Sequence, residues 1–242
     1  MAKELVKQEN TSLTERPNYI KQGDTRGTDH ITKDDLQMPR LALAQALSPQ
    51  MQEGDAKFIE GLKVGDLFNN LTGDVFGKGP IDFTVVRADS PRGIEFYPLD
   101  EGGGIKDFSV PLDDHRMEFR TDENGKSIKP AATKFYDYVI MLVPSRELIA
   151  LSFKGTGLKV ARQLNALMKL RGTPSFAGKY SLTTGKETNK LGTFAVHQVK
   201  NAGWVTEDEF KWAEGVYESI KDKTLVIERD QEEEPSEEKT PF

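Results

Sequence analysis

The stretch KFYDYVIMLVPSRELIALSFKGTGLKVARQLNALMKLR, residues 134–171, decides the fold of this chain. Its first part is rich in β-branched and aromatic side chains, stops at a proline and resumes with LIALSF, which indicates two strands joined as a hairpin. A GTG triplet then ends the second strand. In the last part the apolar side chains fall on one half of a helical wheel, and Lys159, Arg162 and Lys169 fall on the other. The stretch therefore predicts a β-hairpin followed by a helix with one buried face and one basic face.

Strand and helix patterns continue on both sides of this stretch. The segments IDFTVVRA (81–88) and GIEFYPL (93–99) are expected to form one hairpin. The segments KYSLTT (179–184) and GTFAVHQV (192–199) are expected to form the last one, across a turn of Gly, Lys, Glu, Thr and Asn. The segment TEDEFKWAEGVYESIK, which begins at residue 206, predicts a second helix because a capping pattern precedes a stripe of apolar side chains.

The order of these elements is strands, strands, helix, strands, helix, which predicts a mostly β chain with helices, of the α+β class. This order matches the five-stranded barrel of the OB-fold, whose helix lies between the third and fourth strands, with an added C-terminal helix and flexible termini. A general α+β sandwich fits nearly as well. We expect residues 37–227 to form a single OB-like domain, with residues 38–70 packed onto its core as short pieces. Residues 1–36 are expected to form a flexible arm and residues 228–242 a disordered acidic tail.

The composition argues against several classes of protein. Hydrophobic residues make up 36% of the 242 residues, which is enough for a real core. No apolar run approaches the roughly 18 to 20 residues that cross a bilayer, and the first residues do not resemble a signal peptide, so no membrane partner is expected and the protein should stay in a cytoplasm. The chain has no cysteine, and His30, His115 and His197 stand far apart. Neither a metal nor another cofactor is therefore expected.

Two short motifs are poor candidates for catalysis. Gly155, Thr156 and Gly157 lack the third glycine of a dinucleotide-binding loop, so an ordinary turn from strand to helix is the better interpretation. The charged run from Asp113 to His115 is typical of a solvated turn. No catalytic residue and no enzymatic activity are therefore expected.

Charge is distributed unevenly along the chain. The formal net charge is −6, yet residues 146–200 contain ten Lys or Arg residues and only two Glu. Aromatic residues are interleaved with these cations, a combination that single-stranded nucleic acid requires, because cations hold phosphates and exposed rings stack on bases. The alternative is that the rings are core residues and the lysines a solvated face. The candidate cations are Lys154, Lys159, Arg162, Lys169, Arg171, Lys179, Lys186 and Lys190, and the candidate rings are Phe135, Tyr136, Phe153, Phe176, Tyr180 and Phe194.

The last residues, EEEPSEEKTPF, combine carboxylates with an aromatic tip. Seven acidic and two basic side chains lie in residues 228–242. A polyanion tethered to a cationic surface can occupy that surface until nucleic acid displaces it. Glu237, Glu238, Pro241 and Phe242 are expected to form a hook that a partner protein grips through an apolar pocket with a basic rim. The alternative is a plain solubilising tail.

The tail that ends in KTPF resembles the acidic tip of bacterial single-stranded DNA-binding proteins and the Phe-terminated tails of their phage counterparts. The stretches PRLALAQALSP (39–49), GLKVGDLFNNLTG (61–73) and FKGTGLKVARQLNAL (153–167) are also similar to a phage-encoded family that is believed to serve this role. The resemblance implies an OB-fold that coats exposed DNA strands in replication, recombination or repair, in the host cytoplasm if the protein is phage-encoded. It also implies a tail that recruits a polymerase, helicase-primase or nuclease.

Other functions stay open at this point. A protein-interaction adaptor or virion component would use the basic surface to meet an acidic protein, and a nuclease is a less favoured alternative. The sequence also leaves open whether the protein forms a homodimer.

Overall fold

A computed structural model describes Gly27, residues 38–98, 101–143, 145–189 and 192–223, and Ile227. The expected N-terminal arm, apart from Gly27, and the expected C-terminal tail lie outside the described residues. The fold described below belongs to the unit that begins at Met38.

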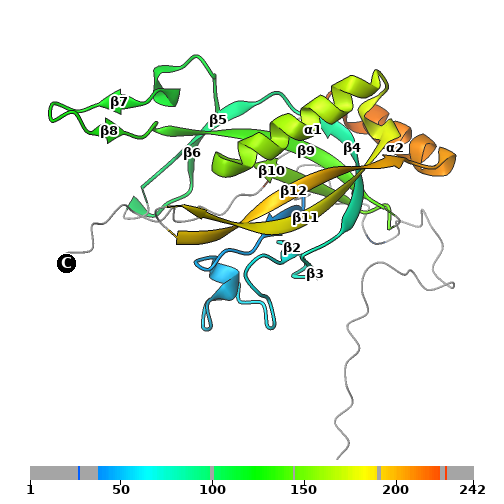
Figure 1. The fold of residues 1–242 in the computed structure, drawn as a ribbon, viewed down its shortest axis with the longest axis horizontal. Helices are drawn as coiled ribbons and strands as arrows, with labels where there is room; N and C mark the ends of the chain where they lie inside the picture. Colours follow the sequence, from blue (N-terminus) through cyan, green and yellow to red (C-terminus); the bar gives the residue numbers. More distant parts are fainter. Residues whose placement is uncertain are drawn as a thin grey trace, which may run out of the picture. The chain divides into compact units, whose positions relative to one another are not determined.

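The described part is mostly β with two α-helices, so it belongs to the predicted α+β class (Figure 1). The strands are β1 (Arg40–Leu43), β2 (Leu67–Asn69), β3 (Val75–Gly77), β4 (Ile81–Ala88), β5 (Arg92–Phe96), β6 (Ile105–Val110), β7 (Arg120–Thr121), β8 (Ser127–Ile128), β9 (Ala132–Leu142), β10 (Leu148–Phe153), β11 (Gly178–Asn189) and β12 (Gly192–Trp204). The helices are η2 (Pro49–Met51), η4 (His115–Met117), η5 (Gly155–Gly157), α1 (Leu158–Arg171), η6 (Ser175–Ala177) and α2 (Glu207–Ile220), of which the η elements are short 3₁₀ helices.

The main sheet is curled, and its strands follow the order β12-β11-β4-β9-β10-β1-β2-β3. Strands β4, β9 and β10 are antiparallel neighbours, α1 follows β10, and β11 then returns to pair with β4. Strand β1 lies parallel to β10, whereas the other pairs in this sheet are antiparallel. The path has more strands than the five expected, because β1 and β2, which form within residues 38–70, and the adjoining β3 all join the sheet instead of packing onto it.

Strand β9 is apolar on both sides because a helix covers each face of the sheet there. Tyr138, Ile140 and Leu142 pack in the cluster that contains α1, on the inner face of the curl. Val139 and Met141, which alternate with them, pack in the cluster that contains α2. Successive side chains of a strand point to opposite faces, so a run that is apolar throughout requires cover on both. This explains the sequence YVIML at the centre of the fold.

Both predicted α-helices are confirmed, and local signals fix their ends. Helix α1 ends where Gly172 adopts a φ of 60°, a left-handed conformation that glycine takes without strain. Helix α2 begins with a capping box, in which the Glu209 N–H donates to Thr206 Oγ1 at 3.3 Å and the Thr206 N–H donates to Glu209 Oε2 at 2.7 Å.

The predicted hairpin of residues 81–88 and 93–99 is wrong. Strands β4 and β5 do not pair with each other but run one after the other along the same edge of β9, and the register continues from Ala88 opposite Tyr138 to Arg92 opposite Phe135. Between them lies Pro91, which has no N–H to donate to a neighbouring strand. The proline therefore interrupts the pairing with β9 between β4 and β5, and the sequence alone does not distinguish this interruption from the turn of a hairpin.

The two other predicted hairpins are present, the last one with longer strands than expected. Strands β9 and β10 pair from Met141 opposite Leu148 to Tyr136 opposite Phe153. Strands β11 and β12 pair as far as Asn189 opposite Gly192, so residues 185–189, expected as the turn, belong to β11. No helix in the described part of the chain is both long and apolar enough to span a membrane.

Candidate nucleic-acid interface

The outer face of α1 carries exposed cations and no acid. Lys159, Arg162 and Lys169 are all exposed, and the helix contains no Asp or Glu. Of these three, Lys159 forms an ion pair with Glu187 of β11. Gln163 anchors the helix by donating from Nε2 to the Val199 carbonyl of β12 at 3.1 Å. The structure therefore brings three of the predicted cations together on one fixed surface, which we call the α1 face.

The last residue of α1 forms a stack with two aromatic rings. The Arg171 guanidinium carbon lies 4.3 Å from the centroid of the Trp204 ring and 5.2 Å from that of Tyr180. Its Nη2 atom donates to Asn201 Oδ1 at 2.6 Å, which fixes its orientation. Trp204, at the end of β12, is 58% exposed, whereas Tyr180 is buried. An accessible indole backed by a cation thus lies at the C-terminal end of α1.

Sequence reasoning missed Trp204, although this aromatic residue closely follows the predicted basic segment and the predicted last strand. The predicted basic segment ended at Lys200 and the predicted strand at Val199, four or five residues before the tryptophan. The strand in fact continues through NAGW to the N-cap of α2. Trp204 is thereby placed opposite Gly178, next to the end of α1.

Most of the candidate stacking rings are core residues, so the alternative interpretation holds for them and their candidacy as stacking residues is corrected. Phe135, Phe153, Phe176 and Tyr180 are each at most 6% exposed. The Phe153 ring packs edge-on against Tyr138. The Phe176 and Tyr180 rings make tilted contacts with other rings inside the two clusters that α2 and α1 cover. A ring sealed in the core offers no face to a base. Tyr136 and Phe194 are half-buried, and Lys134 Nζ lies over the Tyr136 ring at 5.2 Å from its centroid.

The remaining predicted cations are not gathered on the α1 face. Lys179 is half-buried and lies 4.0 Å from Asp82, while Lys186 is exposed seven residues later on β11. An odd spacing along a strand places two side chains on opposite faces. Lys154 is half-buried just before η5. The predicted residues Lys190, Glu237, Glu238, Pro241 and Phe242 lie outside the described residues.

The charged run at residues 113–115 belongs to a cluster of ion pairs. Arg116 contacts Glu95 at 2.8 Å, Asp107 at 3.0 Å and Asp114 at 2.9 Å. Hydrogen bonds from Arg116 lower the pKa of Asp114 to about 2. This carboxyl group therefore stays ionised at neutral pH and is unsuited to donate a proton in catalysis. Within the described residues, no group of three or more His, Asp or Glu side chains is placed to hold a metal ion.

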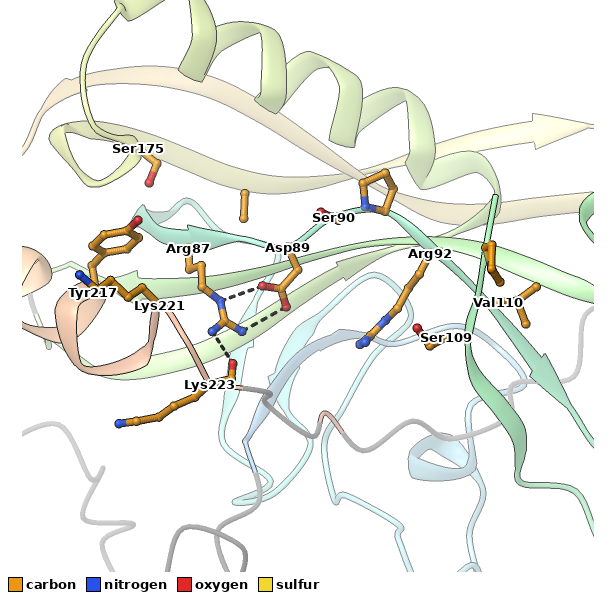
Figure 2. Close-up of a pocket in the computed structure, with 13 residues that line it drawn as sticks. Arg87, Asp89, Ser90, Arg92, Ser109, Val110, Ser175, Tyr217, Lys221 and Lys223 are labelled. Atoms are coloured by element: carbon orange, nitrogen blue, oxygen red, sulfur yellow. Dashed lines mark hydrogen bonds and ion pairs between the residues drawn. The ribbon is translucent and has the colours of Figure 1, made fainter. Parts of the chain in front are cut away.

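A hollow of about 780 Å³ lies on the other face of the sheet from α1, above the break between β4 and β5. Figure 2 shows Arg87, Asp89 and Arg92 side by side in it, with Lys221 and Lys223 contributed by the end of α2 and the residues that follow. Four cations and one carboxylate thus line the hollow, a site that sequence reasoning also missed because its parts come from distant segments.

A comparison with family models matches residues 7–226 of the chain to the Pam3 phage gp34-like protein family. The chain belongs to this family. The name of the family indicates a bacteriophage origin. No curated protein and no solved structure matches the chain.

The matched region of this Pam3 phage gp34-like protein contains every element of the sheet, both α-helices and Trp204. The acidic segment 228–242 lies beyond it. The α1 face and the hollow therefore belong to the part of the chain on which family membership rests, and the segment that resembles tails of single-stranded DNA-binding proteins does not.

Proposed function

We propose that this protein binds single-stranded DNA through the α1 face and the adjoining Arg171–Trp204 stack, and that it coats exposed strands during phage DNA replication, recombination or repair. The observation that carries the proposal is an accessible indole stacked on Arg171, at the end of a helix whose outer face carries exposed cations. No catalytic role is proposed for it.

Each part of this surface suits one part of a single strand. Lys159, Arg162 and Lys169 neutralise phosphates and release counterions, which gives affinity without sequence preference. Trp204 offers a flat apolar face to an unpaired base, and such stacks contribute about 1 to 3 kcal/mol each. A duplex keeps its bases stacked inside, so it can use the cations but not the indole. The protein should therefore prefer single strands.

The order of the strands supports an OB-like barrel as the framework of this surface. Strands β4, β9 and β10 precede α1, and β11 and β12 follow it, so the helix lies between the third and fourth of these five strands. Strand β1 lies beside β10, and Gln45, just after β1, contacts β12. In this proposal β1 to β3 are an addition that closes the curl.

We further propose that residues 228–242 regulate this surface. Their carboxylates compete with DNA for the cations, and Glu237, Glu238, Pro241 and Phe242 bind a replication protein, such as a polymerase, helicase-primase or nuclease. Displacement of the segment by DNA would then expose its tip to the partner only where single strands are present.

The proposal is tested by titrating labelled oligodeoxythymidine, duplex DNA and RNA of equal length with the full chain across a salt series. We expect tightest binding to single-stranded DNA and about a tenfold or larger loss of that affinity in Trp204→Ala. The matched control is Phe119→Ala, which removes a ring that is 73% exposed. Phe119 directly precedes β7 and is far from α1 in sequence. Equal affinity for duplex and single strands, or equal losses in the two variants, would contradict the proposal.

A second candidate function is that of a protein-interaction adaptor or virion component. Large apolar side chains are exposed around β6 to β8, among them Phe108, Phe119 and Ile128. Contiguous exposed apolar residues often mark protein interfaces. The same titration, repeated with oligodeoxythymidine of several lengths, separates the two functions, because an adaptor would show no dependence on oligonucleotide length and no preference for single strands.

A further inference from the structure

Exposed large apolar side chains gather in three regions of the described chain. Leu170 and Trp204 lie at the C-terminal end of α1, where DNA binding is proposed. A second group lies within residues 47–75, and a third lies within residues 97–128. DNA binding does not explain the last two groups. Exposed apolar side chains that gather together often mark a protein interface, so each of these groups is a candidate for one.

The second group contains a patch at the edge of a small apolar cluster. Val75 lies opposite Phe68, a buried member of this cluster, so both side chains are on one face of the β2–β3 pair. Phe58 precedes Ile59, which packs against the same cluster and whose side chain lies against the turn that follows Leu71. Phe58, Leu71 and Val75 are all exposed, and we call these three residues the β2–β3 patch.

Carboxylates flank the β2–β3 patch. Glu60 and Asp74 lie close to its members in the sequence, and both are exposed. Asp74 accepts through Oδ2 from the Thr72 hydroxyl at 2.6 Å, and neither carboxylate takes part in an ion pair within the described residues. Residues 53–78 as a whole contain five acidic and three basic side chains. A partner that presents cations beside an apolar side chain would therefore complement this surface.

The β7–β8 hairpin, in the third group, presents this combination. Ile128 lies opposite Arg120, so both side chains are on one face of the hairpin, and Lys126, two residues before Ile128, lies on that face too. All three are exposed, and neither cation takes part in an ion pair within the described part of the chain. Asp122 Oδ1 accepts from the N–H groups of Asn124 and Lys126 at 2.9 and 2.8 Å, inside the turn. We call Arg120, Lys126 and Ile128 the Ile128 face.

The hairpin stands apart from the main sheet. Strands β7 and β8 have two residues each and form a sheet of their own, which projects away from the body of the fold (Figure 1). An isolated two-stranded hairpin is at best marginally stable in water, so cover for Ile128 would stabilise it. In Figure 1 the hairpin lies well away from β2 and β3, so it does not cover the β2–β3 patch of its own chain.

We propose that the Ile128 face of one copy of this protein binds the β2–β3 patch of a second copy. Ile128 covers the apolar side chains of the patch, while Arg120 and Lys126 meet Glu60 and Asp74. Because the two surfaces differ, the contact is head-to-tail and leaves one hairpin and one patch free for further copies. Each surface is small, so the association is weak. Neither surface includes a residue of the α1 face or Trp204, so the proposal is independent of DNA binding.

Sedimentation velocity of the full chain without DNA, over a concentration range of about 1 μM to 1 mM, tests the contact. The average mass should rise with concentration. Ile128→Asp and Phe58→Asp should each weaken the association by about tenfold or more, because a charge is brought into an apolar contact. Since Phe58 lies beside the small cluster, Glu60→Lys tests the patch with a solvent-facing side chain, and it should weaken association several-fold. The control is Leu170→Asp, at a side chain that is 85% exposed on α1, and it should associate as the wild type does.

A mixture of Ile128→Asp and Phe58→Asp chains tests the head-to-tail arrangement. One variant keeps an intact patch and the other an intact hairpin, so the mixture should form a dimer of the two variants and no larger species. A contact between two hairpins would not be restored by mixing. The proposal is overturned if the wild-type chain stays monomeric up to about 1 mM, the weak end of the affinity scale. It is equally overturned if the folded variants associate as the wild type does, or if mixing restores no dimer.

Discussion

The side-chain amide of Gln45 forms two hydrogen bonds with the backbone of Ala195, at the free edge of β12. Its Nε2 atom donates to the Ala195 carbonyl at 2.9 Å, and the Ala195 N–H donates to its Oε1 atom at 3.0 Å. A side chain that follows β1 therefore pairs with β12 as a neighbouring strand would. In the sheet order β12 is the first strand and β1 lies near the other end. This contact therefore joins the two ends of the curled sheet.

We predict that Gln45→Ala lowers the free energy of unfolding by about 2 kcal/mol, since two hydrogen bonds are lost and the Ala195 edge is left unpaired. Urea denaturation measures the change. Gln52→Ala is the matched control, because Gln52 makes a single exposed hydrogen bond to the Ala46 carbonyl. If both variants lose the same small amount, the amide of Gln45 does not fasten the sheet.

The parts of the fold that the sequence predicts are those whose information is local. Helix α1 follows from its apolar periodicity, α2 from Thr206 and Glu209, and the β9–β10 hairpin from two apolar runs around a short turn. The succession of β4 and β5 along β9 was not predictable in this way. Pro91 breaks the pairing in the same manner whether the chain turns back or continues, and only the partner strand decides between them.

The candidate site was harder to predict than the fold, because charge is readable from sequence and exposure is not. The acid-free face of α1 follows from the helical wheel. The burial of Phe153 and Tyr180 does not follow from strand alternation, since strands covered on both faces are apolar throughout. Trp204 and the hollow depend on contacts between the end of α1, the end of α2 and the β4–β5 break, which are far apart in the chain.

The pH dependence of stability should reflect His197. Burial, with a further contribution from the positive charge of Arg40, lowers the pKa of His197 from 6.5 to about 4, and its ring packs edge-on against Phe153. The unfolded chain therefore takes up a proton at a pH where the folded ring stays neutral. We expect this residue to reduce the free energy of unfolding, by up to about 3 kcal/mol, as the pH falls from about 6.5 to about 4, and no further below that.

Urea denaturation of the wild type and of His197→Leu at several pH values isolates this contribution. The difference between the two curves should change across that interval and be constant above it. The control is His115→Gln, whose side chain is exposed in the wild type, and which should follow the wild-type curve. A His197→Leu curve that stays parallel to the wild type throughout would show that the ring is not held neutral by the fold.

The α1 face should determine the salt dependence of DNA binding. Each phosphate that a cation neutralises on a single strand contributes about 0.7 to the slope of log affinity against log salt. Arg162→Gln/Lys169→Gln should therefore reduce the magnitude of this slope by about 1.4 and weaken binding at low salt. The charge-matched control is Lys57→Gln/Lys63→Gln, in the exposed loop between η2 and β2. A similar change of slope in both double variants would mean that DNA affinity depends on the total charge of the protein and not on the α1 face.

Removal of residues 228–242 should reveal whether the acidic segment competes with DNA. The truncated chain loses seven acidic and two basic side chains, so under the proposed competition no tethered polyanion opposes DNA at the α1 face. We expect tighter binding to a labelled oligonucleotide at low salt and convergence with the full chain near 1 M salt, where the Debye length falls to about 3 Å. Deletion of Phe242 alone is the control, because it removes the apolar tip and keeps every acidic side chain. It should leave DNA affinity unchanged while abolishing the capture of a replication partner. Truncation that fails to strengthen DNA binding at low salt would exclude competition, and the acidic segment would then act on partners alone.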